Sequence, residues 1–579
     1  MEISELATKS TPTVRAEWLR AAMLFGLVIA AGLATNPFFE MGFNDDWDYS
    51  RLALAFAKTG QIHYAGWTAV SALVQSVYGG TLSYLFGGGP TVHRLGTLFA
   101  AGFIPILTYL IGRELGLRAR VAYFAALTFG LSPFMIPNAV SFMTDTYGCL
   151  FTLGAIHAGL KAVRAERESS AFAWLLAGLL WAFLGGAERQ VVWVAGPSVM
   201  AGYLIAWRAG DRKYLVLASF ASAAYLATCW LLMNWLKRQP GFIFEAPDAS
   251  TVLMSRNQVL RAVQLYGALL LTLVALSLPA LAAGVSLRAH RLILAASALC
   301  GAAAYMISGR VLSLRFPYLP NQLTIYGLLN PEAVLPGNVP VLLSPQLCRV
   351  VTALACALAV FLLASVLPRL RENAMGLRRT VFKANIAEHR EAVAYVVPVT
   401  YALLYLGALL VRARRGEFYD RYALLLLPLA IFAVLRLWQA AGMERPGAAA
   451  YVLLGILATY GVAITHDYFA LSKARAGAID RLSASGVARN LVIAGFEADM
   501  AYQVESRGSI HHVAEVDSSV PEGMSPRIWY IAMTPAITPV YFFSTSKLAG
   551  MEPCGVAPIP YQTWLGPHGR SLYVLCHTG

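Results

Sequence analysis

Long apolar runs, separated by short polar segments, fill the chain from Trp18 to His466. A run of about 20 apolar residues matches one helical crossing of a bilayer, and neighbouring helices can shield shorter runs. The pattern therefore predicts roughly thirteen transmembrane helices. The predicted spans are Trp18–Asn36, Val92–Ile111, Val121–Ile136, Tyr147–Val163, Phe172–Gly186, Val191–Trp207, Tyr214–Trp235, Leu265–Ala283, Leu292–Ser308, Leu347–Leu367, Ala392–Leu410, Tyr422–Leu437 and Ala448–His466.

The composition strengthens this interpretation. Hydrophobic residues make up 58% of the 579 residues, charged residues only 13%, and the mean hydropathy is +0.58. Soluble globular proteins have about 25% charged residues. These values exclude a disordered chain, a nucleic-acid-binding module and an ordinary cytosolic enzyme. The net charge of +14 is then typical of a membrane protein whose Lys and Arg stay on the cytoplasmic side.

Basic residues concentrate in alternate loops, which orients the bundle. By the positive-inside rule those loops face the cytoplasm. An odd number of spans then places the N-terminus in the cytoplasm and the C-terminus outside the inner (cell) membrane. The first apolar run is long and no A-x-A-like site follows it, so no cleavable signal peptide is expected. The basic loops are Arg113–Arg120, Lys161–Arg167, Arg208–Lys213, Arg288–Arg291 and Arg369–Arg390.

After His466 polar and apolar positions mix, which predicts a separate unit. We expect a transmembrane domain over 1–468, with its first outer loop at 38–91, and a small extracytoplasmic α/β domain over 469–579. The latter should contain a helix and three strands, over Lys473–Ala484, Leu491–Ala494, Arg527–Ala532 and Ser571–Leu575.

Cys554 and Cys576 are the only cysteines of the terminal domain. An oxidising compartment would permit a disulfide between them. The other cysteines lie in or beside predicted spans and are interpreted as packing residues.

Three acids, Asp45, Asp46 and Asp48, open the first outer loop. They have two interpretations of about equal weight. Acids suit the start of a solvated helix, where they complement the dipole. A carboxylate at the membrane surface can also act as a general base. In the second outer loop Asp145 stands at the start of a span, where a lone acid is usually a cap.

Two arginine-bearing tracts lie on the side where positive charge is disfavoured. Glu188 and Arg189 occupy a turn between two apolar spans, either as an ion pair or with Arg189 bound to an anion such as a lipid phosphate. The tract Arg412–Tyr422 has four arginines in ten residues. Unless the topology differs here, this tract favours an anionic head group or a lipid-linked phosphate.

Taken together, these motifs resemble the GT-C glycosyltransferases, in particular bacterial relatives of protein O-mannosyltransferases and lipid A aminoarabinose transferase (glycosyltransferase family 39). The resemblance covers most of the chain. Its carriers are Asp45-Asp46 with Tyr49, Asp145, Arg189, Asp420-Arg421-Tyr422 with Leu427-Pro428, and the terminal stretch from Ala478 to Glu497.

The resemblance implies a role for each matching position. Asp45 matches the catalytic base, Asp46 stands where the family has Glu, and Asp145 matches the acid that places the acceptor or supports the base. Arg189 and Arg421, with Arg415, would bind the donor phosphate. The remaining positions would orient donor or acceptor: Tyr49, Glu188, Tyr419 and Tyr422.

The sequence thus predicts a GT-C-like, α-helical polytopic membrane protein with a small C-terminal α/β domain. Its expected activity is transfer of a sugar from a polyprenyl-phosphate donor to a lipid, glycan or protein acceptor at the outer face, by a single inverting displacement. Some GT-C enzymes use a divalent metal, but no metal-ligand motif stands out in this chain, and no other cofactor is expected. Membrane lipids are expected partners, and nucleic acid is not.

Two other classes compete with this hypothesis. A transporter or flippase would place ionisable residues near the bilayer midplane and show internal repeats, and neither is apparent. A non-catalytic assembly or ligand-binding protein would not need paired acids and arginines at one membrane face.

Overall fold

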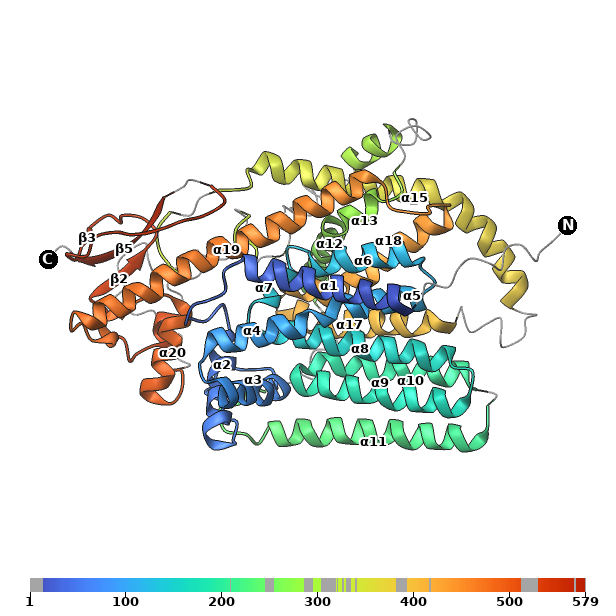
Figure 1. Ribbon diagram of the computed structural model, residues 1–579, viewed down its shortest axis with the longest axis horizontal. Helices are drawn as coiled ribbons and strands as arrows, with labels where there is room; N and C mark the ends of the chain where they lie inside the picture. Colours follow the sequence, from blue (N-terminus) through green and yellow to red (C-terminus); the bar gives the residue numbers. More distant parts are fainter. Residues whose placement is uncertain are drawn as a thin grey trace.

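The computed structural model describes residues 14–208, 210–244, 255–285, 295–303, 319, 321–324, 327–329, 335–338, 341–381, 393–415, 418–511, 530–566 and 569–577. A bundle of helices forms most of the molecule, and a small sheet with one helix lies at one end (Figure 1). We call this the sheet end of the bundle, and the opposite end the far end.

The bundle is formed by helices of very different length. In chain order they are α1 (Val14–Ala34), α2 (Asp46–Thr59), α3 (Leu73–Phe86), α4 (Pro90–Ala101), α5 (Phe103–Glu114), α6 (Ala119–Gly130), α7 (Met135–Ala139), α8 (Thr144–Arg164), α9 (Glu168–Glu188), η2 (Gln190–Val194), α10 (Ala195–Ala206), α11 (Arg212–Leu236), α12 (Arg256–Leu276), α13 (Leu278–Ala282), α15 (Pro345–Val381), α17 (Val396–Arg415), η4 (Asp420–Leu425), α18 (Leu427–Ala440) and α19 (Ala448–Ala484).

Eight helical segments in the described part of the chain are long and apolar enough to cross a membrane, so the protein is an integral membrane protein. Other predicted spans correspond to helices that are shorter or less apolar, such as the 12-residue α6 and the 14-residue α18. The predicted span Leu292–Ser308 lies largely outside the described residues. The eight segments are Val14–Ala34, Pro90–Glu114, Glu168–Glu188, Arg212–Leu236, Arg256–Leu276, Pro345–Val366, Val396–Ala413 and Ala448–Ala484.

Helix α8 lies inside the bundle and is buried along almost its whole length. Glycines on this helix let its neighbours approach closely, which is how helices commonly pack in membranes. A Cβ at Gly154 would meet the ring of Trp181, and one at Gly159 would meet Val199 and Val397. This packing fixes the position of the first turn of α8, which carries Asp145.

The first outer loop folds into α2 and α3, which lie beside the sheet end (Figure 1). The fully buried Arg94 of α4 anchors the segment that leads into α2. Its guanidinium donates hydrogen bonds to the carbonyls of Pro37 (2.8 Å), Phe39 (2.9 Å) and Met41. Asn44 then adopts a left-handed φ of 56°, and α2 begins directly after Asp45.

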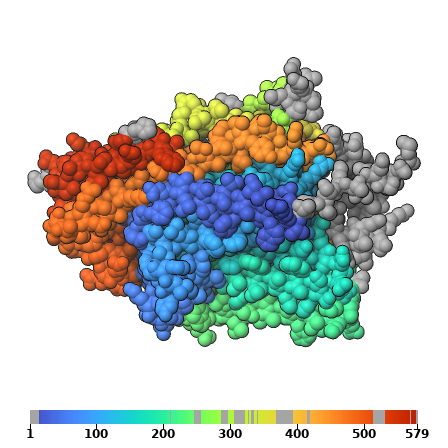
Figure 2. Space-filling view, in the orientation of Figure 1, coloured from blue at the N-terminus to red at the C-terminus, as the bar shows by residue number. Residues whose placement is uncertain are grey.

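The terminal part of the chain is joined to the bundle by a continuous helix. The 37-residue α19 runs unbroken past the expected boundary at residue 468 and contains the predicted helix Lys473–Ala484. Figure 2 shows the last residues of the chain against this helix at one end of the molecule. The other elements of this part are η5 (Arg489–Leu491), β1 (Val492–Ile493), α20 (Phe496–Arg507), η6 (Ile531–Met533), β2 (Tyr541–Ser544), β3 (Met551–Pro553), β4 (Ile559–Tyr561) and β5 (Arg570–His577).

The sheet has the order β1-β2-β5-β3, and β4 also pairs with β5. Strands β1 and β2 are parallel, whereas β5 pairs antiparallel with its three neighbours. A disulfide joins Cys554 to Cys576, the two cysteines that the sequence singled out. The prediction of a strand at Arg527–Ala532 was wrong in the part that the structure describes, which begins at Tyr530. There Ile531–Met533 forms a 3-10 turn.

Candidate active site

Four charged side chains from distant parts of the chain meet at the sheet end of the bundle. Asp45 is the residue immediately before α2 and makes no side-chain capping hydrogen bond, and Asp145 lies in the first turn of α8. Arg189 follows the last residue of α9, and Arg421 lies in η4. All four stand where a helix begins or ends, so the backbone of the bundle sets their separation. We call these four residues the charge cluster.

The acids and arginines alternate within the charge cluster. Nη1 of Arg421 lies 3.3 Å from Oδ2 of Asp45 and 3.9 Å from Oδ2 of Asp145. Nη1 of Arg189 donates a hydrogen bond to Oδ1 of Asp145. On the other side of Asp45, the indole Nε1 of Trp67 donates to Oδ1 at 3.1 Å.

The charge cluster is nearly enclosed but retains some exposure. The side chains of Asp45, Arg421 and Arg189 are 15%, 13% and 11% exposed, and that of Asp145 is 4% exposed. Nε of Arg421 is buried and has no hydrogen-bond partner among the described residues. A donor group in this position is therefore free to bind an anion.

Three tyrosines pack around the charge cluster. The guanidinium carbon of Arg189 lies 5.6 Å from the ring centroid of Tyr422, and that of Arg421 lies 5.3 Å from the ring of Tyr419. Tyr49 is buried, and burial together with the charge of Asp45 raises the pKa of its phenol, so it stays protonated and neutral. Flat aromatic surfaces of this kind restrict where a substrate can lie.

Asp420 holds the segment that carries Arg421, a function that the sequence did not reveal. Its carboxylate accepts hydrogen bonds from the backbone N–H of Gln322 (3.0 Å), Leu323 (2.8 Å) and Arg421 (2.7 Å). Burial raises the pKa of Asp420 to about 6. The neighbouring acid thus fixes the backbone, and the arginine side chain projects toward Asp45.

The structure does not bring Asp46 into the charge cluster. Its carboxylate is 1% exposed and accepts hydrogen bonds from the backbone N–H of Phe43 and Phe142. The acid therefore ties the first outer loop to the second. Burial raises its pKa to about 7, although Arg94 opposes this shift.

Glu188 is also turned away from the charge cluster. It is fully buried, and its Oε2 accepts a hydrogen bond from the backbone N–H of Gln75 at 2.9 Å. Arg189 is paired with Asp145 and shows no ion pair with Glu188. The side chain of Arg415 lies outside the described residues.

Metal-binding side chains do not gather in the described part of the chain. No group of three or more His, Cys, Asp or Glu residues is close enough there to hold an ion. In the charge cluster both carboxylates face arginines, which is a poor environment for a divalent cation.

A cavity of about 340 Å³ lies beside the charge cluster, and Arg189 is the member of the cluster that lines it. Arg189, Arg412 and Tyr422 contribute polar groups to it, and its remaining wall is mainly apolar. That wall comes from η2, α11, α17 and the segment around Phe242. Its apolar residues include Val191, Val194, Met233, Phe242, Leu409 and Val411.

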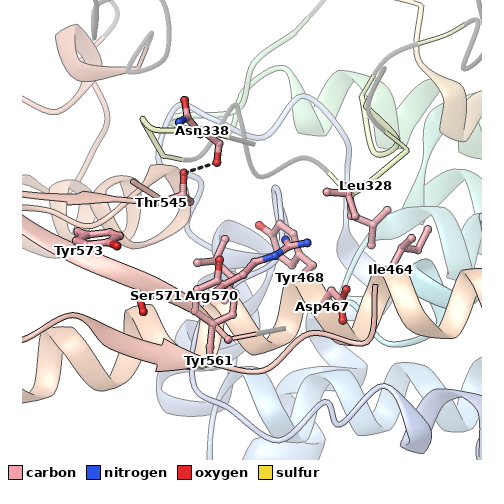
Figure 3. A pocket seen from close by; sticks show the side chains of 13 residues that line it. Leu328, Asn338, Ile464, Asp467, Tyr468, Thr545, Tyr561, Arg570, Ser571 and Tyr573 are labelled. Carbon is pink, nitrogen blue, oxygen red and sulfur yellow. Dashed lines mark hydrogen bonds between the residues drawn. The ribbon is translucent and has the colours of Figure 1, made fainter. Parts of the chain in front are cut away.

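A second cavity of about 340 Å³ lies between α19 and the sheet (Figure 3). Arg570 points into it beside Tyr468 and Tyr561, and Thr545 donates a hydrogen bond to the carbonyl of Asn338 at 3.0 Å. Asp467 at its edge accepts from the backbone N–H of Trp564 and Leu565, so this acid is engaged in holding the terminal segment.

The chain is similar to membrane glycosyltransferases of known structure. No protein-family model and no curated protein matches it significantly. The protein O-mannosyltransferase Pmt1-Pmt2 complex of S. cerevisiae, bound to its sugar donor, is 15% identical over 43% of this chain and 38% of that chain, with a TM-score of 0.33.

Two further structures match more of the chain. The oligosaccharyltransferase AglB of Archaeoglobus fulgidus, bound to an inhibitory peptide and a dolichol-phosphate, is 16% identical over 80% of this chain and 59% of that chain, with a TM-score of 0.39. ArnT of Cupriavidus metallidurans, bound to undecaprenyl phosphate, is 12% identical over 96% of this chain and 98% of that chain, with a TM-score of 0.36.

Proposed function

We propose that this protein is a membrane glycosyltransferase that moves a sugar from a polyprenyl-phosphate donor to an acceptor at the outer face. The observation that carries the proposal is the charge cluster and its position. Two acids and two arginines meet there, and one of them, Arg189, also lines a cavity whose wall is mainly apolar. A lipid-linked phosphate needs both an anion-binding site and an apolar channel.

The donor phosphate binds at Arg189 and Arg421. Arginine forms planar, bidentate pairs with phosphate oxygens, and the free Nε of Arg421 supplies one such donor. The polyprenyl chain then follows the apolar wall of the cavity that begins at Arg189. Asp145, in contact with both arginines, keeps them oriented before the phosphate arrives.

Asp45 is the general base in this proposal. It is the more exposed of the two acids and lies beside Arg421. The base and a phosphate-binding group are therefore close enough to act on the same donor–acceptor pair. The acceptor hydroxyl gives its proton to Asp45 while its oxygen bonds to the anomeric carbon. The bond from that carbon to the phosphate oxygen breaks, and the electron pair leaves with the phosphate.

The arginines stabilise the charge that develops on the leaving phosphate. The transition state has oxocarbenium character, and one displacement inverts the anomeric centre. Asp46 has no place in this chemistry, because both of its oxygens accept backbone hydrogen bonds. We assign it, with Glu188, to holding the loops that carry the charge cluster.

A transporter is less well supported by the same geometry. The charged groups lie at helix ends, and α8 and α9 are unbroken helices beside them. A transport site is expected near the bilayer midplane, next to interrupted helices.

The test is a turnover assay with defined donors. Purified full-length protein is mixed with polyprenyl-phosphate sugars of several classes and an envelope extract as the source of acceptor, and release of polyprenyl phosphate is followed. We expect release with at least one donor, reduced at least about a hundredfold by Asp45→Asn. Arg212→Gln, at the far end, is the matched control and should leave release unchanged. Release that is absent with every donor, or equal in Asp45→Asn, contradicts the proposal.

A further inference from the structure

The far end of the bundle contains a basic cavity that the proposed function does not use. Its volume is about 680 Å³, and it lies between α1, α6 and the segment that joins α18 to α19. Its lining residues are Arg20, Met23, Arg120, Tyr123, Arg445, Pro446, Gly447, Ala448 and Tyr451. Its lining residue Arg20 lies in the first half of α1, and the rest of that helix, to Ala34, spans about 21 Å toward the sheet end.

Three arginines and no acid line this cavity in the described part of the chain. Two acids lie nearby, and each is paired at the rim. Glu17 contacts Arg20 at 3.0 Å, and the exposed Glu444 contacts Arg118 at 3.9 Å. Arg120 and Arg445 have no acid within ion-pair distance among the described residues, so the cavity retains a positive charge.

Two helix N-termini add to this positive charge. Helix α6 begins at Ala119 and α19 begins at Ala448, and neither has a side-chain cap. The first N–H groups of a helix lack partners within the helix and favour an anion. The cavity thus combines backbone donors with arginine side chains.

Tyr123 supplies a further polar group. Its hydroxyl is buried and has no hydrogen-bond partner among the described residues, although the residue lines the cavity. A buried hydroxyl without a hydrogen-bond partner costs free energy unless a ligand or a water molecule forms that hydrogen bond. This is an independent indication that the cavity is built to hold a polar group.

The surroundings identify the kind of ligand. Met23 is 49% exposed and Tyr451 is 47% exposed on apolar membrane helices, so one side of the cavity opens toward lipid. A soluble phosphate has no apolar part that could contact this lipid-facing side of the cavity. A phospholipid can place its acyl chains there. Basic pockets between membrane helices commonly bind the head groups of anionic lipids.

We infer that this cavity is a binding site for an anionic phospholipid of the leaflet opposite the candidate active site. Its phosphate lies between Arg120 and Arg445, and Tyr123 donates a hydrogen bond to it. The lipid connects α6 to the start of α19, the helix that continues to the sheet end.

Native mass spectrometry of delipidated full-length protein tests this inference. Phosphatidylglycerol and phosphatidylcholine with identical acyl chains are titrated, and glycerol phosphate serves as the soluble competitor. We expect phosphatidylglycerol to bind more tightly. Arg120→Gln/Arg445→Gln should weaken its binding about thirtyfold, because each basic residue contributes about fivefold. Arg212→Gln is the matched control, since Arg212 is an exposed arginine at the same end and lies outside the cavity.

A second variant separates lipid binding from folding. Tyr123→Phe removes a hydroxyl without a described protein partner, so the melting temperature of the delipidated protein should not fall, while phosphatidylglycerol binding weakens severalfold. Equal binding of the two lipids, unchanged binding in both variants, or displacement by millimolar glycerol phosphate would each overturn the inference.

Discussion

Two groups of buried charges in this protein use the same residue types in different ways. In the terminal domain, Asp499 is fully buried and accepts hydrogen bonds from Arg489 (2.7 Å), Ala494, Gly495 and Tyr530 (3.0 Å each). In the charge cluster, Asp45 is partly exposed and has two donors, Trp67 and Arg421. The first carboxylate is saturated within the protein, whereas the second keeps capacity for a proton or a ligand.

The number of hydrogen-bond donors thus distinguishes a carboxylate that stabilises the fold from one that can still accept a proton or bind a ligand. A saturated buried carboxylate gains nothing from a substrate, since every lone pair that a new donor would use is occupied. A charge cluster at 4–15% exposure is desolvated enough to interact strongly and still accessible. Mutation of the saturated carboxylate should therefore lower stability, whereas mutation of the charge cluster should lower turnover or donor binding.

A large effect of a single substitution on stability is expected in the terminal domain. Asp499→Asn leaves Arg489 without its carboxylate and places an amide against backbone N–H donors, which should cost about 3 kcal/mol. Hydrogen exchange of the α20 amides should accelerate about a hundredfold in the full-length protein. Turnover per folded molecule should stay within about twofold of wild type, and a loss comparable to that of Asp45→Asn would show that the two groups are not separable.

Asp46 is expected to make stability depend on pH. Its folded-state pKa, about 7, lies above its ordinary value of 3.8, so the native state holds a proton that the unfolded state has lost. The contribution is present below about pH 4 and is lost as pH rises toward 7, at up to about 1.4 kcal/mol per pH unit. The melting temperature of wild type relative to Asp46→Asn should fall over this interval and level off above pH 8.

The same variant sharpens the choice between the two adjacent acids. Asp46→Asn should retain turnover, measured at a pH where it is folded, because the hydrogen bonds that Asp46 accepts come from the backbone of Phe43 and Phe142. If Asp46→Asn loses turnover and Asp45→Asn keeps it, the wrong carboxylate has been assigned as the base.

The arginines of the charge cluster should affect donor binding more than folding. Replacing Arg189 or Arg421 with Ala should weaken donor binding about ten- to a hundredfold, since a hydrogen bond to a charged group contributes about 1.5–3 kcal/mol. Lys should restore only part of the loss, because it keeps the charge without the planar fork. Binding of a labelled polyprenyl phosphate measures both effects.

Arg412 provides the comparison for those two variants. It lines the cavity on α17 without belonging to the charge cluster. Arg412→Ala should have a smaller effect that salt removes, as expected for general attraction to an anionic lipid. Small, equal and salt-sensitive losses in all three variants would indicate a diffuse lipid-binding surface.

The sequence predicted the helical bundle because long apolar runs leave few alternatives. It predicted less of the terminal sheet, whose β2, β3 and β4 are only three or four residues long and show too little alternation to detect. The Ile531–Met533 segment has apolar residues typical of a strand, yet it forms a 3-10 turn directly after Tyr530, whose hydroxyl donates a hydrogen bond to Asp499. A contact between residues 31 positions apart is not visible in a local pattern.

The same limit applies to the charge cluster. Asp45 and Asp46 are chemically identical neighbours, and their different environments follow from the left-handed backbone at Asn44 and the anchoring of the preceding segment by Arg94. Sequence analysis selected Arg189 and Arg421 because arginine is disfavoured on the outer side of the membrane, and Asp145 through the resemblance to the GT-C glycosyltransferases. Sequence patterns did not select Trp67, since an interfacial tryptophan is common in membrane proteins.

Trp67 gives the smallest and most specific prediction. Its indole N–H orients Asp45, while its ring packs against Phe496, 5.4 Å between centroids. Trp67→Phe keeps much of the ring contact and removes the donor, so kcat should fall about fivefold at an unchanged KM for the donor, as expected for one hydrogen bond of about 1 kcal/mol. The matched control is Trp47→Phe, because the indole N–H of Trp47 is buried nearby without a hydrogen-bond partner among the described residues. If both variants lower kcat equally, the aromatic packing positions Asp45, and the hydrogen bond from Trp67 has no separate role.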